Sequence, residues 1–289
     1  MRICGFSIVR QAVRFGYPVE ESLRSLLPLV DELVVGVGDG DDGTWELLGA
    51  IGDPKLALFR STWDPSQRAG GEVLSRETNK ALDRCRGDWA VYLQADEVLH
   101  EAELPALRRL LEEHRARATE TISFRYFHFY GSYETIQDNP NWFYPRATRA
   151  VRLGIGVRSV GDACAFMVAE NGTLRRPRRL DSRLHIYHYG RVRPPQVMLA
   201  KMRNFERLYH DDAWIHRHGV DAVGADVYGR LGHLRRFEST HPAVMRHHIA
   251  ARDWSFDPQL DRQQPAWRRR SLNYVHWALS RAVARLRSR

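Results

Sequence analysis

The alternation of strand and helix signals over the first hundred residues is the feature that most constrains the fold of this chain. Short apolar runs rich in Val, Ile and Leu have the composition of buried parallel strands, and amphipathic segments separate them. Strands are expected at residues 3–9, 32–37, 56–59 and 89–93, and helices at residues 18–29, 44–51 and 75–85. Helical crossovers between parallel strands require an open sheet with helices on both faces. The sequence therefore predicts an α/β fold with a doubly wound, mostly parallel sheet.

The pattern changes after the first hundred residues. A helix is expected at residues 104–116, and strands are expected at residues 121–130, 150–157 and 185–190. From residue 194 onward the pattern is helical, with no further strand signal, and no low-complexity linker precedes it. The sequence thus predicts an α/β domain over residues 1–193 and a helical C-terminal region, residues 194–289, packed on it.

Composition limits the classes of protein to which the chain can belong. With 43% hydrophobic and 27% charged residues among 289, the chain can bury a core, and it has no run of 18 apolar residues that would span a membrane. The apolar stretch at its start is too short for a secretion signal. Cys4, Cys85 and Cys164 form no CxxC pair, which argues against a disulfide framework or a cysteine zinc site. We therefore expect a cytoplasmic protein.

Charge is distributed unevenly along the chain. The first hundred residues hold 11 basic and 16 acidic residues, whereas the remainder holds 33 basic and 19 acidic residues. An acidic part joined to a basic part suits anionic lipid, or a phosphate-bearing substrate held between the two. An Arg-rich composition with solvated faces explains the same counts equally well.

Polar loops directly follow two of the expected strands, at the edge where ligands of doubly wound sheets bind. Residues 94–97 place carboxylates at the tip of an apolar strand, where Mg²⁺ or Mn²⁺ bridging to a diphosphate is the natural occupant. Extended geometry turns Asp96 toward that ligand, and Glu97 either points away from it or reaches the residues behind it. A cap for the next helix is the alternative. In the glycine-rich loop at residues 38–44, Asp39 can accept hydrogen bonds from a base or ribose, unless the loop is an ordinary acidic turn.

At these residues the sequence resembles glycosyltransferase family 2, whose members have the GT-A fold, and in particular the bacterial cell-surface polysaccharide enzymes. In that family the first strand ends near Ser-Ile-Val, as it does here at Ser7 and Val9. The second strand ends in a loop that touches the nucleoside, similar to the loop that holds Asp39 and Asp41. The resemblance implies that these four residues bind the donor, a nucleoside-diphosphate sugar.

Two further segments extend the resemblance. The family's fourth strand ends in an Asp-x-Asp motif that holds a metal and the diphosphate. Here Gln94 replaces the first Asp, and Asp96 matches the metal-binding last Asp. The resemblance implies Mn²⁺ or Mg²⁺ as cofactor, although one negative charge is missing. The helix before this strand carries Asn79 at the position of the Asn in the family's Ala-Arg-Asn motif, and Arg76 is close enough to reach a phosphate.

The resemblance also indicates where an acceptor would be activated. Related enzymes place a carboxylate after a strand-like segment such as the one that precedes Asp162. An inverting transfer needs a base that takes the proton of the acceptor hydroxyl, and we expect Asp162 to be that base. Glu134 and Asp138 are the rival candidates. Aromatic residues at positions 142–144 are placed where an acceptor sugar could stack, and core packing explains them nearly as well.

A histidine-rich segment follows the last expected strand. Many GT-A enzymes have a His there that coordinates the metal, and His188 resembles it. If the segment is extended, His185 and His188 point to opposite faces, so only one of them joins the site. Arg191 and Arg193 follow directly and could neutralise the diphosphate leaving group.

The resemblance implies a metal-dependent, inverting transfer of a sugar to a hydroxyl of a glycan or lipid-linked acceptor, in cell-surface polysaccharide synthesis. A sugar-1-phosphate nucleotidyltransferase is one alternative, but residues 10–14 lack the Gly-rich loop that such enzymes carry. A nucleic-acid binding module is another, supported by the basic run at residues 175–179. That run is short and has no recognition motif, so no nucleic-acid partner is expected.

The last residues, 271–289, place Leu and Val on one helical stripe, with Trp277 near the middle and four Arg toward the end. A basic amphipathic helix with an aromatic anchor can lie in a membrane interface. Peripheral contact with the inner face of the plasma membrane is therefore a second expectation. Packing of the same stripe on the catalytic domain is the alternative.

Overall fold

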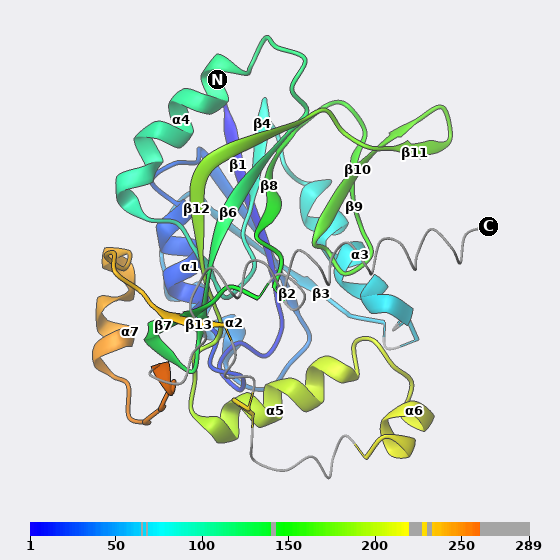
Figure 1. Cartoon of the computed structure of the whole chain (residues 1–289). Helices are drawn as coiled ribbons and strands as arrows, with labels where there is room; N and C mark the ends of the chain where they lie inside the picture. The colour runs from blue at the N-terminus through cyan, green and yellow to red at the C-terminus, as the bar shows by residue number, and fades with distance from the viewer. Residues whose placement is uncertain (65, 68, 140–142, 220–226, 230–232, 261–289) are drawn as a thin grey trace, which may run out of the picture.

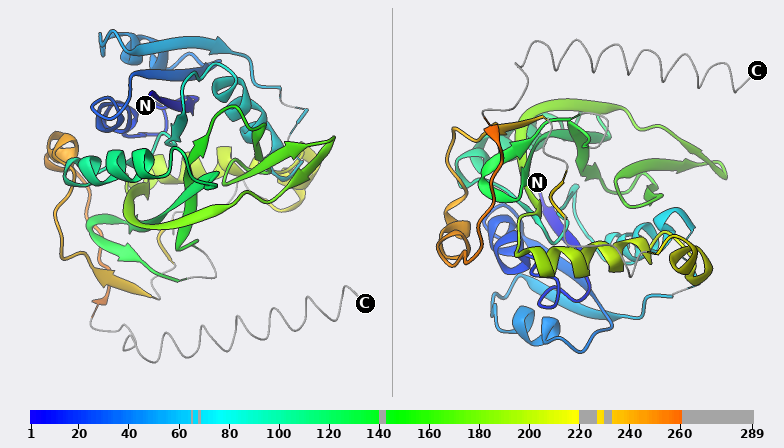
Figure 2. Two further views of the ribbon diagram at one scale, coloured as in Figure 1. Left: turned by 90° about the horizontal axis from the view of Figure 1, so that it is seen from above. Right: turned by 60° about the horizontal axis from the view of Figure 1, so that its bottom comes forward.

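The structure of the chain is a computed structural model, and it describes all residues except 65, 68, 140–142, 220–226, 230–232 and 261–289 (Figure 1). Its described part contains a sheet of ten strands and a second sheet of three strands. Helices cover both faces of the large sheet, as the two views in Figure 2 also show. No helix of this described part is long and apolar enough to cross a membrane.

Four parallel strands form one half of the large sheet: β1 (Ile3–Val9), β2 (Glu32–Gly38), β3 (Leu56–Ser61) and β4 (Trp89–Tyr92). Strand β1 pairs in parallel with β2 and β4, and β2 pairs in parallel with β3. All seven residues of β1 are buried, as expected for a central strand with helices on both sides. The predicted α/β fold class is confirmed.

The helices of this half lie on opposite faces of the sheet. Helices α1 (Val19–Leu26), α2 (Thr44–Gly49) and α4 (Leu104–Glu113) contribute to one core, and α3 (Glu72–Leu82) contributes to the other. Short 3-10 turns, η1 (Ala69–Gly71) and η2 (Glu101–Glu103), precede α3 and α4. Because successive side chains of a strand point to opposite faces, Ile3 and Val9 join the first core, whereas Phe6 joins the second.

The other half of the sheet contains β5 (Glu97–Val98), β6 (Thr121–Tyr130), β7 (Ser132–Gln137), β8 (Arg146–Arg152), β12 (Arg179–Arg191) and β13 (Leu234–Arg236). Strand β8 pairs antiparallel with both β4 and β6, which joins the two halves and makes β6 point in the same direction as β4. Strand β12 runs parallel to β6. The carboxyl ends of β1, β4, β6 and β12 therefore meet at one edge.

Helix α5 (Pro195–Glu206) follows β12 and runs beneath the lower edge of the sheet in Figure 1. It is followed by α6 (Asp212–Arg217), η4 (Ala243–Met245) and α7 (Arg246–Ala250). The right view of Figure 2 shows α5 crossing the molecule in front of the strands. This helix thus covers the edge at which the parallel strands end.

The single strand expected over residues 150–157 is wrong. Strand β8 ends at Arg152, and β9 (Val157–Val160) belongs to the three-stranded sheet, in which it pairs with β10 (Ala165–Glu170), itself paired with β11 (Thr173–Arg175). Gly154 and Gly156 turn the chain between the two strands with φ values of 77° and 73°. Glycine adopts these left-handed values without a steric penalty, and the apolar residues on both sides of the turn had the pattern of one continuous strand.

The expectation of a purely helical C-terminal part is also wrong, because β13 pairs antiparallel with β7. Strand β13 has three residues at the edge of the sheet, two of them arginines, and this composition has no strand pattern. Its conformation comes from pairing with β7. The helix expected over residues 271–289 lies outside the described residues.

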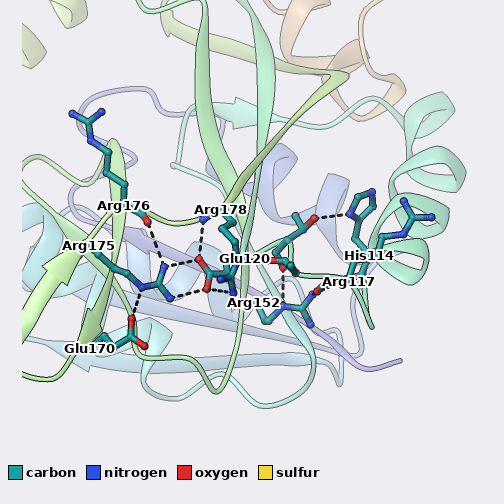
Figure 3. A network of polar contacts seen from close by, with 10 residues as sticks. His114, Arg117, Glu120, Arg152, Glu170, Arg175, Arg176 and Arg178 are labelled. Carbon is teal, nitrogen blue, oxygen red and sulfur yellow. Dashed lines mark hydrogen bonds and ion pairs between the residues drawn. The ribbon is translucent and has the colours of Figure 1, made fainter.

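The basic run at residues 175–179 holds a buried carboxylate (Figure 3). Arg175 places Nη1 and Nη2 2.8 Å from the two oxygens of Glu120, and Arg178 Nη2 lies 2.7 Å from the same carboxylate. The Glu120 side chain is 4% exposed. The hydrogen bonds from Arg175, opposed by burial and aided by Arg178, lower the pKa of Glu120 to about 2. Two arginines of the run therefore tie β11 and β12 to the start of β6.

Candidate active site

A cavity of about 370 Å³ lies between helix α5 and the edge at which the parallel strands end. Ligands of open α/β sheets bind at this edge, and the volume is typical of a small-molecule site. Its walls come from the ends of β1, β4 and β12, the loop after β9, and α5. Among the residues predicted from the sequence, it contains Val9, Gln94, Asp96, Asp162, His188 and Arg191.

Asp96 lies in the loop directly after β4, and its side chain is 9% exposed. Its nearest charged neighbour is Lys201 of α5, whose Nζ is 2.8 Å from Oδ2 and 2.9 Å from the carbonyl oxygen of Gly190. His188 Nε2 is 3.7 Å from Oδ1. Burial alone would raise the pKa of Asp96, but the nearby charges, Lys201 first, hold it well below its ordinary value. Asp96 is therefore ionised, and Lys201 is its counter-ion.

Two cations are buried beside this one carboxylate. Arg193 is 2% exposed, lies over the ring of Tyr17 and donates a hydrogen bond to the Gly190 carbonyl. Its Nε and Nη2 atoms have no hydrogen-bond partner among the described residues. Lys201 Nζ lies 4.6 Å from the centre of the same ring. Burial and the charge of Arg193 lower the pKa of Lys201 to about 7, although Asp96 opposes this shift. Lys201 is therefore partly neutral at pH 7 without a ligand, and an anionic ligand beside it would favour the charged ammonium.

A pair of histidines forms another wall of the cavity. His128 and His188 are opposite each other in the register of β6 and β12, and their Nδ1 atoms are 2.8 Å apart. His128 Nε2 lies 2.7 Å from the carbonyl oxygen of Tyr144, which can only accept, so this nitrogen carries a proton. Burial lowers the pKa of His128 to about 3 and that of His188 to about 4, so both rings are neutral at pH 7. The network then assigns an unprotonated Nε2 to His188.

Asp162 lies in the turn after β9 and faces the same cavity. Its Oδ1 accepts a hydrogen bond from the backbone N–H of Cys164 at 3.3 Å, and its Oδ2 accepts one from the Tyr209 hydroxyl at 3.1 Å. A carboxylate with one hydrogen bond on each oxygen keeps lone pairs for a substrate proton. The rivals Glu134 and Asp138 form ion pairs with arginines and do not line this cavity.

The loop after β2 lies behind the cavity wall. Asp39 accepts hydrogen bonds from the backbone N–H of Trp63 and from Arg10 Nη2, both at 3.1 Å. Arg10 and Trp63 line the cavity, whereas Asp39 does not. Asp41 forms an exposed ion pair with Arg14 at 2.7 Å. The structure therefore places Asp39 one layer behind the site and Asp41 outside it.

Three further predicted donor-binding residues are not brought to the cavity. Ser7 is fully buried and donates a hydrogen bond to the Leu93 carbonyl at 2.6 Å. The Asn79 side chain exchanges hydrogen bonds of 3.0 and 2.9 Å with the backbone of Ser159, which fastens α3 to β9. Arg76 pairs with Glu72 on the exposed face of α3. Their binding of the donor stays a prediction.

The sequence missed three residues that the fold brings to the site: His128, Tyr209 and Lys201. His128 is one of several aromatic residues in an alternating strand, so nothing local distinguishes it. Lys201 is separated from Asp96 by 105 positions. A lysine count could have drawn attention to it, because Lys201 is one of only three lysines among 44 basic residues.

The predicted metal ligands, Asp96 and His188, lie near each other, but their surroundings do not fit a divalent cation. Mn²⁺ and Mg²⁺ favour sites with carboxylate oxygens. The one other carboxylate of the strand tip, Glu97, forms a fully buried ion pair with Arg149, and the ammonium of Lys201 already lies against Asp96. Within the described part of the chain, no three His, Cys, Asp or Glu residues form a metal-binding group.

Residues 18–170, more than half of the chain, match the profile of a protein family described as Glycosyl transferase family 2. A search of curated proteins finds no match. The solved structures described next resemble the chain at low sequence identity and with TM-scores below 0.5.

S. aureus TarS is 16% identical, with 77% of this chain and 42% of TarS covered and a TM-score of 0.41. The mannosyltransferase PcManGT from Pyrobaculum calidifontis, in complex with GDP-Man and Mn²⁺, is 14% identical over 72% of this chain and 62% of its own, with a TM-score of 0.43. Glucosyl-3-phosphoglycerate synthase from Mycobacterium tuberculosis, in complex with Mn²⁺, UDP and phosphoglyceric acid, is 14% identical over 73% of this chain and 80% of its own, with a TM-score of 0.41. This chain thus spans less than half the length of TarS.

Proposed function

Because this chain belongs to glycosyltransferase family 2 and has a GT-A fold, we propose that it transfers a sugar from a nucleoside-diphosphate sugar to a hydroxyl group. The proposed acceptor is a glycan or lipid-linked sugar in cell-surface polysaccharide synthesis. The observation that supports this most is that a carboxylate able to act as a base, Asp162, lines the same cavity as the positive site around Lys201. A transfer of this kind needs both features.

In the proposed mechanism, Asp162 takes the proton of the acceptor hydroxyl as its oxygen attacks the anomeric carbon. The new glycosidic C–O bond forms while the C–O bond to the diphosphate breaks, and the electron pair of that bond leaves on the phosphate oxygen. Attack from the face opposite the leaving group inverts the anomeric carbon, through a transition state that resembles an oxocarbenium ion. The negative charge that develops on the diphosphate would be stabilised by Lys201 and Arg191.

The aromatic wall of the cavity suits a sugar acceptor. Phe143 and Tyr144, which the sequence indicated for stacking, line the cavity together with Tyr209, whereas Trp142 lies outside the described residues. Aromatic faces cover the apolar side of a sugar ring, and the Tyr209 hydroxyl holds the proposed base. The acceptor would therefore bind between these rings and Asp162.

The test is a panel of UDP-, GDP-, dTDP- and ADP-sugars, in which binding is measured by calorimetry and release of the nucleoside diphosphate is measured by a coupled assay. We expect Asp162→Asn to bind the donor as the wild type does and to lose turnover by roughly 10²–10⁴-fold, the contribution of a general base. Asp138→Asn, an exposed rival outside the cavity, is the matched control and should turn over normally. If Asp162→Asn loses donor affinity and keeps turnover, Asp162 is a binding residue and not the base.

A further inference from the structure

We propose that Lys201 of α5 supplies the positive charge that binds the donor diphosphate, at the place beside Asp96 where the sequence predicts a divalent cation. The nucleoside diphosphate then binds without added metal. This inference rests on the proposed function and specifies how the site holds its leaving group.

The geometry around Lys201 leaves it able to bind an anion. Its ammonium has three N–H groups, of which one points to Asp96 at 2.8 Å and one to the Gly190 carbonyl at 2.9 Å. The residue lines the cavity, although its side chain is only 12% exposed. The two hydrogen bonds fix the position of the ammonium in the wall of the cavity. The third N–H group has no acceptor among the described residues and is available to a phosphate oxygen.

The charges near Asp96 favour an anion over a further cation. Arg193 is buried and the Lys201 side chain is only 12% exposed beside this carboxylate, and Arg191 lines the same cavity. The charge of Glu97, the next residue, is balanced by Arg149. A divalent cation bound to Asp96 would therefore lie beside an ammonium in a poorly solvated site, where like charges repel strongly. A diphosphate, which carries more than one negative charge, would be attracted.

Arg193 strengthens this preference from behind the wall. Two of its guanidinium nitrogens have no hydrogen-bond partner among the described residues, so its charge is not offset by a bonded carboxylate. Its Nη1 instead donates to the Gly190 carbonyl, which also accepts from Lys201. The same carbonyl thus positions both cations on one side of Asp96.

A metal and the Lys201 ammonium cannot both bind Asp96 in the arrangement seen here, so an experiment can distinguish them. His188 Nε2, 3.7 Å from Asp96 Oδ1, offers a second ligand of the type that a metal accepts. To use both ligands, a metal would have to displace the Lys201 ammonium. Removal of the metal should therefore leave nucleotide binding unchanged, whereas removal of the ammonium should weaken it.

The experiment measures binding of UDP, GDP, CDP, dTDP and ADP to the full chain by calorimetry, once in EDTA and once with excess MnCl₂. For the nucleotide that binds best, we expect affinities in the two conditions to agree within roughly threefold. Lys201→Met should bind it at least roughly tenfold more weakly in EDTA, and Lys201→Arg should retain more of the affinity than Lys201→Met. Loss of the free-Mn²⁺ signal in electron paramagnetic resonance, beyond the loss that the nucleotide causes without protein, counts metal bound to the chain, and no such further loss is expected for the wild type.

Lys55→Met is the matched control, because Lys55 lies just before β3, at the amino end of the parallel strands, and its Nζ bonds only the Leu27 carbonyl among the described residues. Its nucleotide affinity should equal that of the wild type. Tight binding that requires Mn²⁺, with one Mn²⁺ bound per chain, overturns the inference and leaves the proposed function intact. Equal affinities of Lys201→Met and wild type also overturn it. Failure of every nucleotide to bind, with or without Mn²⁺, overturns both.

Discussion

The carboxylate next to Asp96 has a structural role that predicts a large loss of stability on mutation. Glu97 and Arg149 are both fully buried and joined by hydrogen bonds of 2.7 and 2.8 Å, and the Tyr126 hydroxyl donates to the same carboxylate at 2.8 Å. Glu97→Gln would leave the guanidinium buried without its counter-ion. We expect a loss of about 3–5 kcal/mol in the free energy of unfolding, measured by urea denaturation.

The control for this residue is Glu112→Gln on the exposed face of α4, which should change the free energy of unfolding by less than about 0.5 kcal/mol. If Glu97→Gln changes the free energy of unfolding as little as this control does, water reaches Arg149 and solvates it.

The direction of a side chain could be predicted from the sequence where the chain is extended. His188 and His185 lie on β12 and point to opposite faces, since His185 pairs with Glu103 outside the cavity. Asp96 faces the cavity and Glu97 points away from it, as expected, but residues 94–97 form a turn, closed by the hydrogen bond from the Glu97 N–H to the Gln94 carbonyl at 3.0 Å, and not an extended chain. Lys201 could not be predicted, because its meeting with Asp96 depends on how α5 crosses the strand ends.

At the scale of elements, the ion pairs that connect the start of β6 to the segment from β11 to β12 predict that the free energy of unfolding depends on pH. Glu120, with its pKa lowered to about 2 from an ordinary value of 4.5, holds Arg175 and Arg178. A carboxylate with a lowered pKa stabilises the fold fully above its unfolded pKa, and this contribution is lost as the pH falls through about 4.5 toward 2. Glu120→Gln should lower the free energy of unfolding by about 1–3 kcal/mol at pH 7.

The difference between wild type and Glu120→Gln should then shrink as the pH is lowered from 5 to 2.5, in urea titrations at each pH. Arg176→Gln is the control, since the Arg176 side chain has no ion pair in the described structure. A difference that stays constant over this range would place the stabilising interaction elsewhere than on the ionised carboxylate.

The elements that could be predicted are those buried on both faces. Strands β1 and β2 are nearly continuous apolar runs, so composition alone indicates them. Strand β13 could not be predicted, because its three residues adopt strand geometry only through pairing with β7. The turn between β8 and β9 was missed for a related reason: two glycines interrupt what is otherwise one apolar run.

For the molecule as a whole, the basic C-terminal sequence predicts binding to anionic membranes. Residues 271–289 carry an apolar stripe, Trp277 and four Arg near the end. We propose that this segment brings the enzyme to lipid-linked acceptors at the inner face of the plasma membrane. Each basic residue near an anionic surface contributes about 1 kcal/mol, so the full chain should sediment with phosphatidylserine-containing liposomes at low salt. A chain that ends at Arg270 should remain in the supernatant.

Neutral phosphatidylcholine liposomes and high salt are the controls, since both remove the electrostatic attraction. Equal and negligible sedimentation of the two chains would assign the stripe to packing within the protein. That result would leave the proposed chemistry at Asp96 and Asp162 unaffected.

The position of α5 beyond the family-matched segment bears on how such an enzyme could diversify. The match ends at residue 170, yet His188, Arg191 and Lys201 all follow it and complete the site around Asp96. Consider a chimera that joins residues 1–170 to the C-terminal part of another family member. Asp96 would stay the same, but the residue that balances its charge would come from the other protein. Preference for an ammonium or a metal would thus be exchanged together with the segment from β12 to α5, while the four parallel strands β1 to β4 stay the same.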